Sequence, residues 1–310
     1  MESSYEISVI IPVYNEENNI EKLIQKLEHQ TFKNFEIVIV NDGSKDNTEI
    51  KILQQCEKFS NIRYYKNMNS GVGFSRNYGV KKSKGRFVTF LDADDYYDDR
   101  FLELMYNNIQ EKNADVCFCG HNIVTPIGER KAKTFFSKKN VLENYILGNL
   151  KLHTDSWLIN KEIILNNNVL FLEKSNWGED FYFFCKLLSL DINISFLNKY
   201  LTFYTHDFTD DRLSRNTFDK LPKDVELIED IIINLEVVKG DRIYEILLNY
   251  RLPTMLINRL LGYPSNDQTI NYVHMYSPFF LGKKYFYGIP SLKQIIRLTQ
   301  LRFKFRYWRR

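Results

Sequence analysis

Cysteine is scarce in this sequence, and long apolar runs are absent. The 310 residues include only four cysteines, too scattered for a disulfide framework and spaced for neither a zinc ribbon nor a redox pair. We expect four reduced, buried thiols. No apolar run approaches the roughly 18 residues that a membrane-spanning helix needs, and the first residues lack the basic start and apolar core of a signal peptide. These absences predict a cytoplasmic protein that contacts a membrane peripherally at most.

Acidic residues are missing from the last part of the chain. No Asp or Glu follows Asp267, whereas nine Lys and Arg do. The formal charge of +3 therefore combines a basic tail with an acidic body, since residues 1–267 carry 33 Lys and Arg against 39 Asp and Glu. This asymmetry indicates an anionic partner surface. A hydrophobic content of 44% allows a sizeable core and excludes a disordered protein.

Short β-branched runs alternate with helical patterns through the first hundred residues. The runs are largely apolar, as in a sheet covered on both faces. The alternation predicts a doubly wound α/β sheet that binds its ligands beyond the carboxyl ends of the strands. The predicted strands are Ile7–Val13, Glu36–Val40, Ile62–Tyr65 and Phe87–Leu91, and the predicted helices are Asn18–Glu28, Thr48–Glu57, Ser75–Lys82 and Phe101–Glu111.

The alternation loosens later in the chain and gives way to helix. The remaining predicted strands are Ala114–Val124 and Ile194–Tyr204, and the remaining helices are Phe181–Ser189, Val225–Val238, Tyr244–Leu261 and a last segment opened by Pro290. We therefore expect an α/β domain at residues 1–217 and a mainly helical accessory region, with a basic aromatic tail, at residues 218–310.

Polar motifs follow three of the predicted strands. They are Pro12–Glu16, Asn41–Ser44 and Asp92–Asp95. Several carboxylates at the end of an apolar strand repel one another unless a cation is present, and oxygen ligands suit Mg²⁺ or Mn²⁺ bridging two phosphates. The alternative is a helix N-terminus, in which Asp94 or Asp98 caps the helix predicted from Phe101.

Five motifs, in the order of a known family, cover about two thirds of the chain. They are Ile10–Glu16, Val40–Ser44, Asn69–Gly79, Leu91–Asp95 and Gly178–Asp180. With them the sequence resembles the inverting nucleotide-sugar glycosyltransferases of family 2, of the bacterial surface-glycan or adhesin-glycosylation type. The resemblance ends near residue 217. It implies the GT-A fold, a Rossmann-like, doubly wound mixed sheet.

The resemblance assigns a donor-binding role to residues in the first three motifs. Pro12, Tyr14 and Glu16 match the segment that lines the base and ribose of the nucleotide. Asp42 matches the carboxylate that accepts the N3–H of uracil, which implies a UDP-sugar donor; alternatively, it is a turn aspartate before a glycine. Arg76 matches a basic residue near the base and phosphates, and its alternative is a solvated helix charge.

The resemblance also implies a metal site and a catalytic base. In the motif Asp92-Ala93-Asp94, Asp94 matches the carboxylate that binds Mn²⁺ or Mg²⁺, and Asp92 faces the ribose or supports the site. Asp180 matches the base that takes the proton from the acceptor hydroxyl, so that one displacement inverts the sugar carbon. Without the resemblance, Asp180 would be an ordinary acidic residue of a first helical turn.

The segment Tyr204–Arg215 resembles the part that closes over the pyrophosphate in many family members, although its Asp210-Asp211 pair departs from the commoner spacing. His206 is a candidate metal ligand or a structural histidine. The candidate phosphate contacts are Arg212, Ser214 and Arg215, and the candidate sugar-stacking residues are Trp157 and Trp177, which fit a core equally well.

Basic and aromatic residues are mixed in the tail at residues 290–310. Such a segment suits the surface of an anionic membrane, contact with a second copy of the chain, or packing on the acidic body. Nucleic acid is disfavoured, because no DNA- or RNA-binding motif is present.

The predicted function is transfer of a hexose or N-acetylhexosamine from a UDP-sugar to a hydroxyl of a lipid-linked or protein-linked glycan, in the cytoplasm or at the inner face of the membrane. Three alternatives remain at this point. They are a polyprenyl-phosphate glycosyltransferase, a non-catalytic subunit that binds nucleotide sugars, and a sugar nucleotidyltransferase, whose usual Gly-rich basic loop is absent here.

Overall fold

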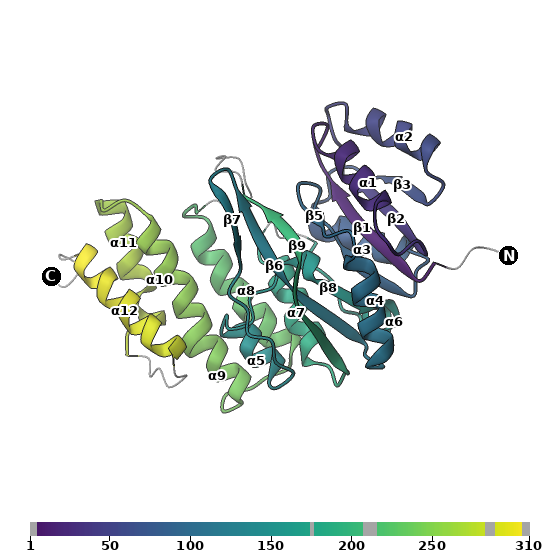
Figure 1. Ribbon diagram of the computed structural model, residues 1–310. Coiled ribbons are helices and arrows are strands. Elements are labelled where there is room, and N and C mark those ends of the chain that lie inside the picture. Colours follow the sequence, from purple (N-terminus) through teal and green to yellow (C-terminus); the bar gives the residue numbers. More distant parts are fainter. Residues whose placement is uncertain (1–4, 174–176, 207–215, 283–288, 306–310) are drawn as a thin grey trace. The chain divides into compact units, whose positions relative to one another are not determined.

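The structure is a computed structural model that describes residues 5–173, 177–206, 216–282 and 289–305 (Figure 1). It divides into two compact units. One consists of Met1–Lys139 with Lys151–Thr209, and the other of Asn140–Leu150 with Asp210–Arg310. The border expected near residue 217 stays a prediction, because residues 207–215 lie outside the described part of the chain.

Four parallel strands form one half of the sheet in the first unit. In spatial order they are β3 (Ile62–Lys66), β2 (Phe35–Asn41), β1 (Ile7–Val13) and β4 (Phe87–Phe90). Every residue of β2 is buried, as expected for a central strand covered on both faces. The crossovers are α1 (Ile20–Glu28), α2 (Thr48–Lys58) and α3 (Val72–Lys82).

The other half of the sheet is mixed. Strand β4 pairs antiparallel with β8 (Trp157–Asn160), and the order continues through β6 (Val116–Thr125), β9 (Ile194–Thr205) and β5 (Tyr96–Tyr97). Strand β7 (Gly128–Lys131) forms a hairpin with β6. The helical elements of this half are α4 (Phe101–Glu111), η1 (Thr154–Ser156), α6 (Lys161–Asn166) and α7 (Glu179–Ser189). This arrangement agrees with the predicted mixed α/β sheet.

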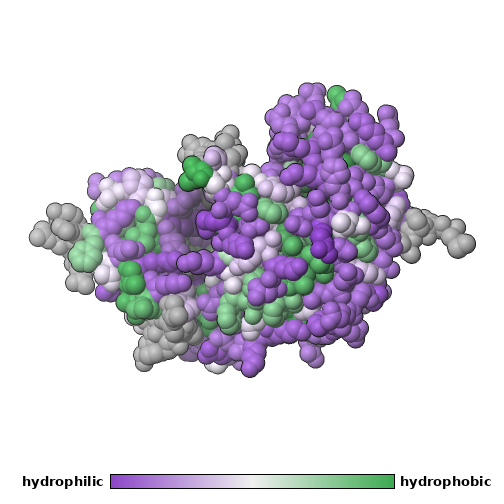
Figure 2. Space-filling view, in the orientation of Figure 1, coloured by the Kyte–Doolittle hydropathy of each residue, from purple (hydrophilic) through white to green (hydrophobic). Residues whose placement is uncertain are grey.

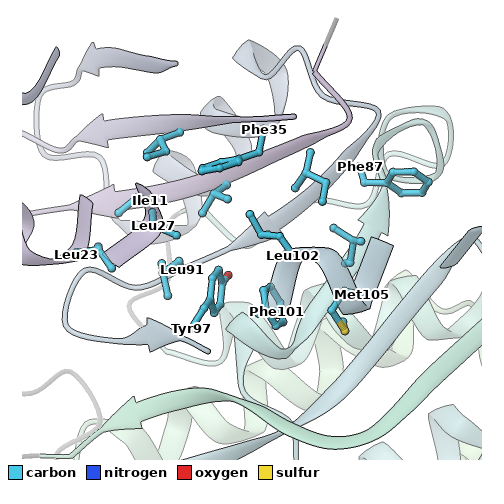
Figure 3. Close-up of a cluster of buried hydrophobic side chains, with 14 of the residues drawn as sticks. Ile11, Leu23, Leu27, Phe35, Phe87, Leu91, Tyr97, Phe101, Leu102 and Met105 are labelled. Atoms are coloured by element: carbon cyan, nitrogen blue, oxygen red, sulfur yellow. The ribbon is translucent and has the colours of Figure 1, made fainter. Parts of the chain in front are cut away.

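The core of this unit lies between the sheet and two helices. Figure 3 shows Ile11 and Phe35 of the strands packed with Leu23 of α1 and Leu102 of α4. On α3, Gly79 is required, because a Cβ at this position would collide with the side chain of Ile10. The helix therefore lies close to β1, and its polar residues are fixed relative to the strand ends.

The second unit is helical. Its elements are α5 (Val141–Ile146), α8 (Lys220–Asn234), α9 (Arg242–Ile246), the π-helical turn η2 (Leu247–Arg251), α10 (Leu252–Gly262), α11 (Asp267–Tyr276), η3 (Ser277–Phe279) and α12 (Ile289–Lys304). Helix α10 contacts α8, α11 and α12. A buried ion pair between Arg259 of α10 and Asp224 of α8 joins two of them, with Nη2 donating to Oδ1 at 2.9 Å. Among the described residues, no helix has the length and apolar character to cross a membrane.

Candidate active site

The loops after β1 and β2 hold each other at the carboxyl edge of the sheet. Asn15 adopts the left-handed conformation, with φ of 55°. Its backbone N–H donates to Ser44 Oγ at 2.9 Å, and its side-chain oxygen accepts from Lys45 N–H at 2.8 Å. Pro12 pairs with Val40 within the sheet, and the ring of Tyr14 is 41% exposed at this edge. The exposed ring has a face available for stacking on a base.

Asp42 is buried, and both of its carboxylate oxygens accept backbone hydrogen bonds. Oδ1 accepts from Ser70 N–H and Oδ2 from Gly71 N–H, each at 2.7 Å. Asp42 thus fixes the turn that begins α3. A carboxylate has about four lone-pair sites, so these two bonds leave acceptor capacity for a further donor.

Arg76 is buried and forms a bridge between two elements. Its guanidinium donates to Asp92 Oδ1 at 2.7 Å and to Glu179 Oε1 at 3.2 Å. Burial lowers the pKa of Arg76, but the charges of Asp92, Glu179 and Asp180 more than offset this and raise it. The alternative of a solvated helix charge is therefore wrong. Arg76 links the end of β4 to the start of α7.

The side chains of Asp92 and Asp94 are half-buried after β4, and Ala93 between them is buried. The pKa of Asp92 is lowered, because the charge of Arg76 offsets the effect of burial. The pKa of Glu16 is raised, mainly by burial and also by the charges of Asp94 and Asp92. Glu16 therefore lies within electrostatic range of the Asp92–Asp94 motif, as its predicted donor-binding role requires.

The fold brings two further residues, His153 and Asp155, to the Asp92–Asp95 motif, and no sequence motif marks either of them. One potential ligand atom from each of Asp92, Asp95, His153 and Asp155 falls within 4.8 Å of the others. His153 Nδ1 lies 3.3 Å from Asp155 Oδ2 and 3.6 Å from Asp95 Oδ2. Asp155 is completely buried; its Oδ2 forms an ion pair with His153, and neither oxygen accepts a backbone hydrogen bond. We call Asp95, His153 and Asp155 the inner cluster.

The charges of the inner cluster shift its own pKa values. Burial and the charge of Asp155 raise the pKa of Asp95. Burial lowers the pKa of His153, but Asp155, Asp92 and Asp180 raise it to about 9. The neighbouring His121 has its pKa lowered to about 3 by burial and by the charge of His153. His153 is thus the protonated member of this histidine pair at neutral pH.

Asp95 also fixes the end of β9. Its Oδ1 accepts from Thr205 N–H at 2.7 Å, and the next residue, His206, donates its N–H to Val124 O at 2.7 Å. Asp95 therefore ties the Asp92–Asp94 motif to the backbone beside His206. Neither Asp94 nor His206 belongs to the group of four described above. Arg212, Ser214 and Arg215 lie outside the described residues.

Asp180 lies in the first turn of α7, after Gly178, which has φ of 75°. Its Oδ1 accepts from Phe181 N–H at 2.6 Å. Burial and the charge of Asp180 raise the pKa of Glu179. Because Asp180 also acts on the pKa values of Arg76 and His153, it belongs to the same group of charges.

The two tryptophans differ in environment. Trp157 is completely buried and stacks on Phe184, with ring centroids 4.6 Å apart. It is a core residue, so it cannot stack on a sugar. Trp177 is half-buried and directly precedes Gly178.

The sequence model of "Glycosyl transferase family 2" matches residues 8–170. This stretch contains the three strand-end motifs, Arg76 and the whole inner cluster. The chain belongs to glycosyl transferase family 2. This is the family that its five motifs resemble.

Two curated relatives differ in how much of their length this glycosyltransferase matches. It is 32% identical over 205 residues to the minor teichoic acid biosynthesis protein GgaB of Bacillus subtilis, covering 61% of this chain and 21% of GgaB. It is 29% identical over 234 residues to WfgD of Escherichia coli, a "UDP-Glc:alpha-D-GlcNAc-diphosphoundecaprenol beta-1,3-glucosyltransferase", covering 74% of this chain and 88% of WfgD. The chain thus spans about a fifth of the first relative and most of the second.

A solved structure of Staphylococcus aureus TarS, residues 1–349, has the same fold. The TM-score is 0.70 at 23% identity, covering 88% of this chain and 80% of that one. A complex of the same TarS fragment with UDP-GlcNAc matches with a TM-score of 0.68 at 20% identity, over 96% and 91% of the two chains. The predicted GT-A fold is confirmed.

Proposed function

We propose that this glycosyltransferase moves a hexose or N-acetylhexosamine from a UDP-sugar to a hydroxyl of a glycan, with a divalent cation and with inversion at the sugar carbon. The observation that carries the proposal is the Arg76 bridge. It joins Asp92, at the end of β4, to Glu179, next to Asp180 in α7. The buried guanidinium of Arg76 thus keeps the proposed donor motif close to the helix turn that carries the proposed base.

Tyr14, Glu16 and Asp42 provide the proposed nucleotide site. Tyr14 offers an exposed ring for a base, and Glu16 offers a carboxylate for a ribose hydroxyl. Asp42 is held rigidly by two backbone donors and keeps acceptor capacity for the N3–H of uracil. The donor named for WfgD and the ligand of the TarS complex, UDP-Glc and UDP-GlcNAc, support a UDP-sugar here.

The residues after β4, together with Asp155 of η1, suit a divalent cation. Asp95 Oδ2 and both oxygens of Asp155 are buried and accept no backbone hydrogen bond, and such carboxylate oxygens are ligands that Mn²⁺ and Mg²⁺ prefer. We assign metal binding to Asp94 and His206. Asp92 and the inner cluster would add negative charge around the bound ion. A bound divalent cation would neutralise the negative charge that develops on the departing UDP.

Asp180 is the proposed general base. It accepts the proton of the acceptor hydroxyl while that oxygen attacks the sugar carbon from the face opposite UDP. The bond to UDP breaks as the new glycosidic bond forms, so no covalent enzyme intermediate is needed and the configuration inverts. Arg76 acts as a positioning residue for this carboxylate through Glu179.

The acceptor is a lipid-linked or protein-linked glycan at the cytoplasmic face of the membrane. The name of WfgD, whose acceptor carries a diphosphoundecaprenol, favours the lipid-linked class. In the alternative of a polyprenyl-phosphate acceptor, the attacking oxygen is already ionised, so the loss of Asp180 would cost little activity.

The deciding experiment measures UDP release from a panel of UDP- and GDP-sugars with Mn²⁺. We expect slow hydrolysis of one UDP-sugar and its loss in Asp94→Ala. Asp180→Asn should reduce transfer roughly 100- to 10,000-fold while UDP still binds. Asp191→Asn, an exposed residue beyond α7, is the matched control and should be fully active.

Other outcomes would point elsewhere. Pyrophosphate released from UTP and a sugar 1-phosphate, with no UDP released from any UDP-sugar, would indicate a nucleotidyltransferase. Tight, metal-dependent UDP binding without turnover, even with candidate acceptors, would indicate a non-catalytic binding subunit. Absence of UDP binding would overturn the proposal as a whole.

A further inference from the structure

Helix α12 has two apolar faces, and only one of them packs against the second unit. The inner face carries Leu301, which is fully buried like Phe305 directly after the helix, and Gln294, whose Oε1 accepts from Thr254 Oγ1 of α10 at 2.9 Å. The outer face carries Leu292, Ile295, Ile296 and Phe303, which are 59, 49, 50 and 65% exposed. We call these four residues the outer stripe.

The spacing of the outer stripe places its four residues on one side of the helix, with the exposed Thr299 between Ile296 and Phe303. Its members follow one another at intervals of three, one and seven residues, which places them on one side of an α-helix. Figure 2 shows apolar side chains along α12 at the left of the view. Single exposed apolar residues are ordinary on a protein surface, but a row of four along one helix marks an interaction site.

Basic residues flank this stripe, and acidic ones are absent. Lys293 and Arg302 are exposed on either side of it. The chain has nine Lys and Arg and no Asp or Glu after Asp267. Lys304 does not contribute to the exposed charge, because its Nζ donates to the carbonyl oxygens of Leu261 and Tyr263 at 2.6 and 2.5 Å.

We propose that the outer stripe of α12 docks on the surface of an anionic lipid bilayer, with the helix lying in the plane of the interface. An apolar stripe bordered by Lys and Arg matches the two layers of such a surface, because the apolar residues enter the acyl boundary and the cations meet the anionic headgroups.

A second copy of the chain is a poorer occupant. A twofold contact places the same patch against itself, so Lys293 and Arg302 of one copy would face the basic flank of the other. The stretch after Asp267 offers no acidic residue to compensate this repulsion. An anionic membrane supplies the missing negative charge.

The test uses the whole chain and flotation with two kinds of vesicle. One contains phosphatidylcholine alone, and the other adds phosphatidylglycerol. We expect binding to the anionic vesicles, weakened by salt. The double variant Ile296→Glu with Phe303→Glu should lower binding at least roughly tenfold. Lys293→Gln and Arg302→Gln should each lower it roughly fivefold.

The matched control is Ile233→Glu on α8, which changes an apolar residue that is 73% exposed outside the stripe. It should bind like the unchanged chain. Hydrolysis of the donor sugar in solution should be the same in all these variants, which separates this proposal from the function proposed above.

Three results would overturn the proposal. The first is equal binding of the unchanged chain and the stripe double variant. The second is equal binding to neutral and anionic vesicles. The third is an oligomer, seen by sedimentation, that the stripe double variant dissociates while the unchanged chain binds no vesicles; this result would assign the stripe to a second copy.

Discussion

Two buried carboxylates in the first unit have opposite surroundings. Asp42 accepts two backbone hydrogen bonds of 2.7 Å, so its charge is satisfied within the fold. Asp155 is also buried, but its oxygens accept no backbone hydrogen bond; they face a second carboxylate, Asp95, and a single cation, His153, whose Nδ1 lies 3.3 Å from Asp155 Oδ2. Burial of a charge is costly unless partners stabilise it. Asp42 therefore serves the fold, and Asp155 belongs to a region that gains from an added cation.

Loss of Arg76 should produce the largest effect, because this buried cation bridges two carboxylates. Arg76→Met would leave Asp92 and Glu179 without their shared cation, and we expect the free energy of unfolding to fall by about 3–5 kcal/mol. Arg76→Lys should lower the free energy of unfolding by less, because a lysine can contact one of the two carboxylates. Urea denaturation measures both, and an unchanged midpoint in Arg76→Met would contradict a structural role for the bridge.

Asp42→Asn should cost about 2–3 kcal/mol of unfolding free energy. The amide replaces one acceptor oxygen by a donor that faces the N–H of Ser70 or Gly71. Asp191→Asn, at an exposed position, should change stability by less than about 0.5 kcal/mol. Thermal unfolding of the pair measures the difference. If the two variants were equally stable, the two backbone hydrogen bonds to Asp42 would not stabilise the fold.

Asp155→Asn should behave differently from Asp42→Asn. In the presence of a chelator, the substitution removes the charge opposite His153 but also relieves the repulsion between Asp155 and Asp95, so we expect it to lower the free energy of unfolding by less than Asp42→Asn does. The rise in melting temperature on adding Mn²⁺ should shrink in this variant and persist in Asp42→Asn. A full Mn²⁺ response in Asp155→Asn would show that the inner cluster does not support the cation.

The last comparison concerns two histidines whose ring centroids lie 6.0 Å apart. The pKa of His121 is depressed to about 3, so its contribution to stability is present above pH 6.5 and is lost as the pH falls toward 3. The pKa of His153 is raised to about 9, so its contribution is present below pH 6.5 and is lost as the pH rises through 9.

Mutation can separate the opposite pH dependences of stability that we expect from His121 and His153. In a chelator, His121→Gln should flatten the acid limb of the stability–pH curve, and His153→Gln should flatten the alkaline limb. Denaturant midpoints at several pH values measure both limbs. Parallel curves for the two variants would contradict the assigned protonation states.

Much of the fold could be predicted from local pattern. The strand Ile7–Val13 and the helix Phe101–Glu111 have the predicted bounds, because each is a strongly periodic apolar segment with clear ends. The short elements β8, α5 and α6 were not predicted. They have four to six residues each, and tertiary contacts rather than periodicity determine them.

The sequence determined which chemical groups the molecule has at the ends of its strands. The motifs around Asp42, Asp92 and Asp180 are visible in it, because each is a short run beside a periodic element. Their roles as donor, metal and base residues remain predictions that the experiments above test.

Only the tertiary structure decided which of these charges are satisfied. His153 and Asp155 meet Asp95 because β8 pairs with β4, and Arg76 meets Glu179 across about a hundred residues of chain. Tertiary structure also decided which face of α12 is exposed. The sequence spacing produces two apolar faces, and packing on α10 buries one of them. A local pattern cannot specify such outcomes, because desolvation and charge pairing depend on neighbours that are distant in sequence.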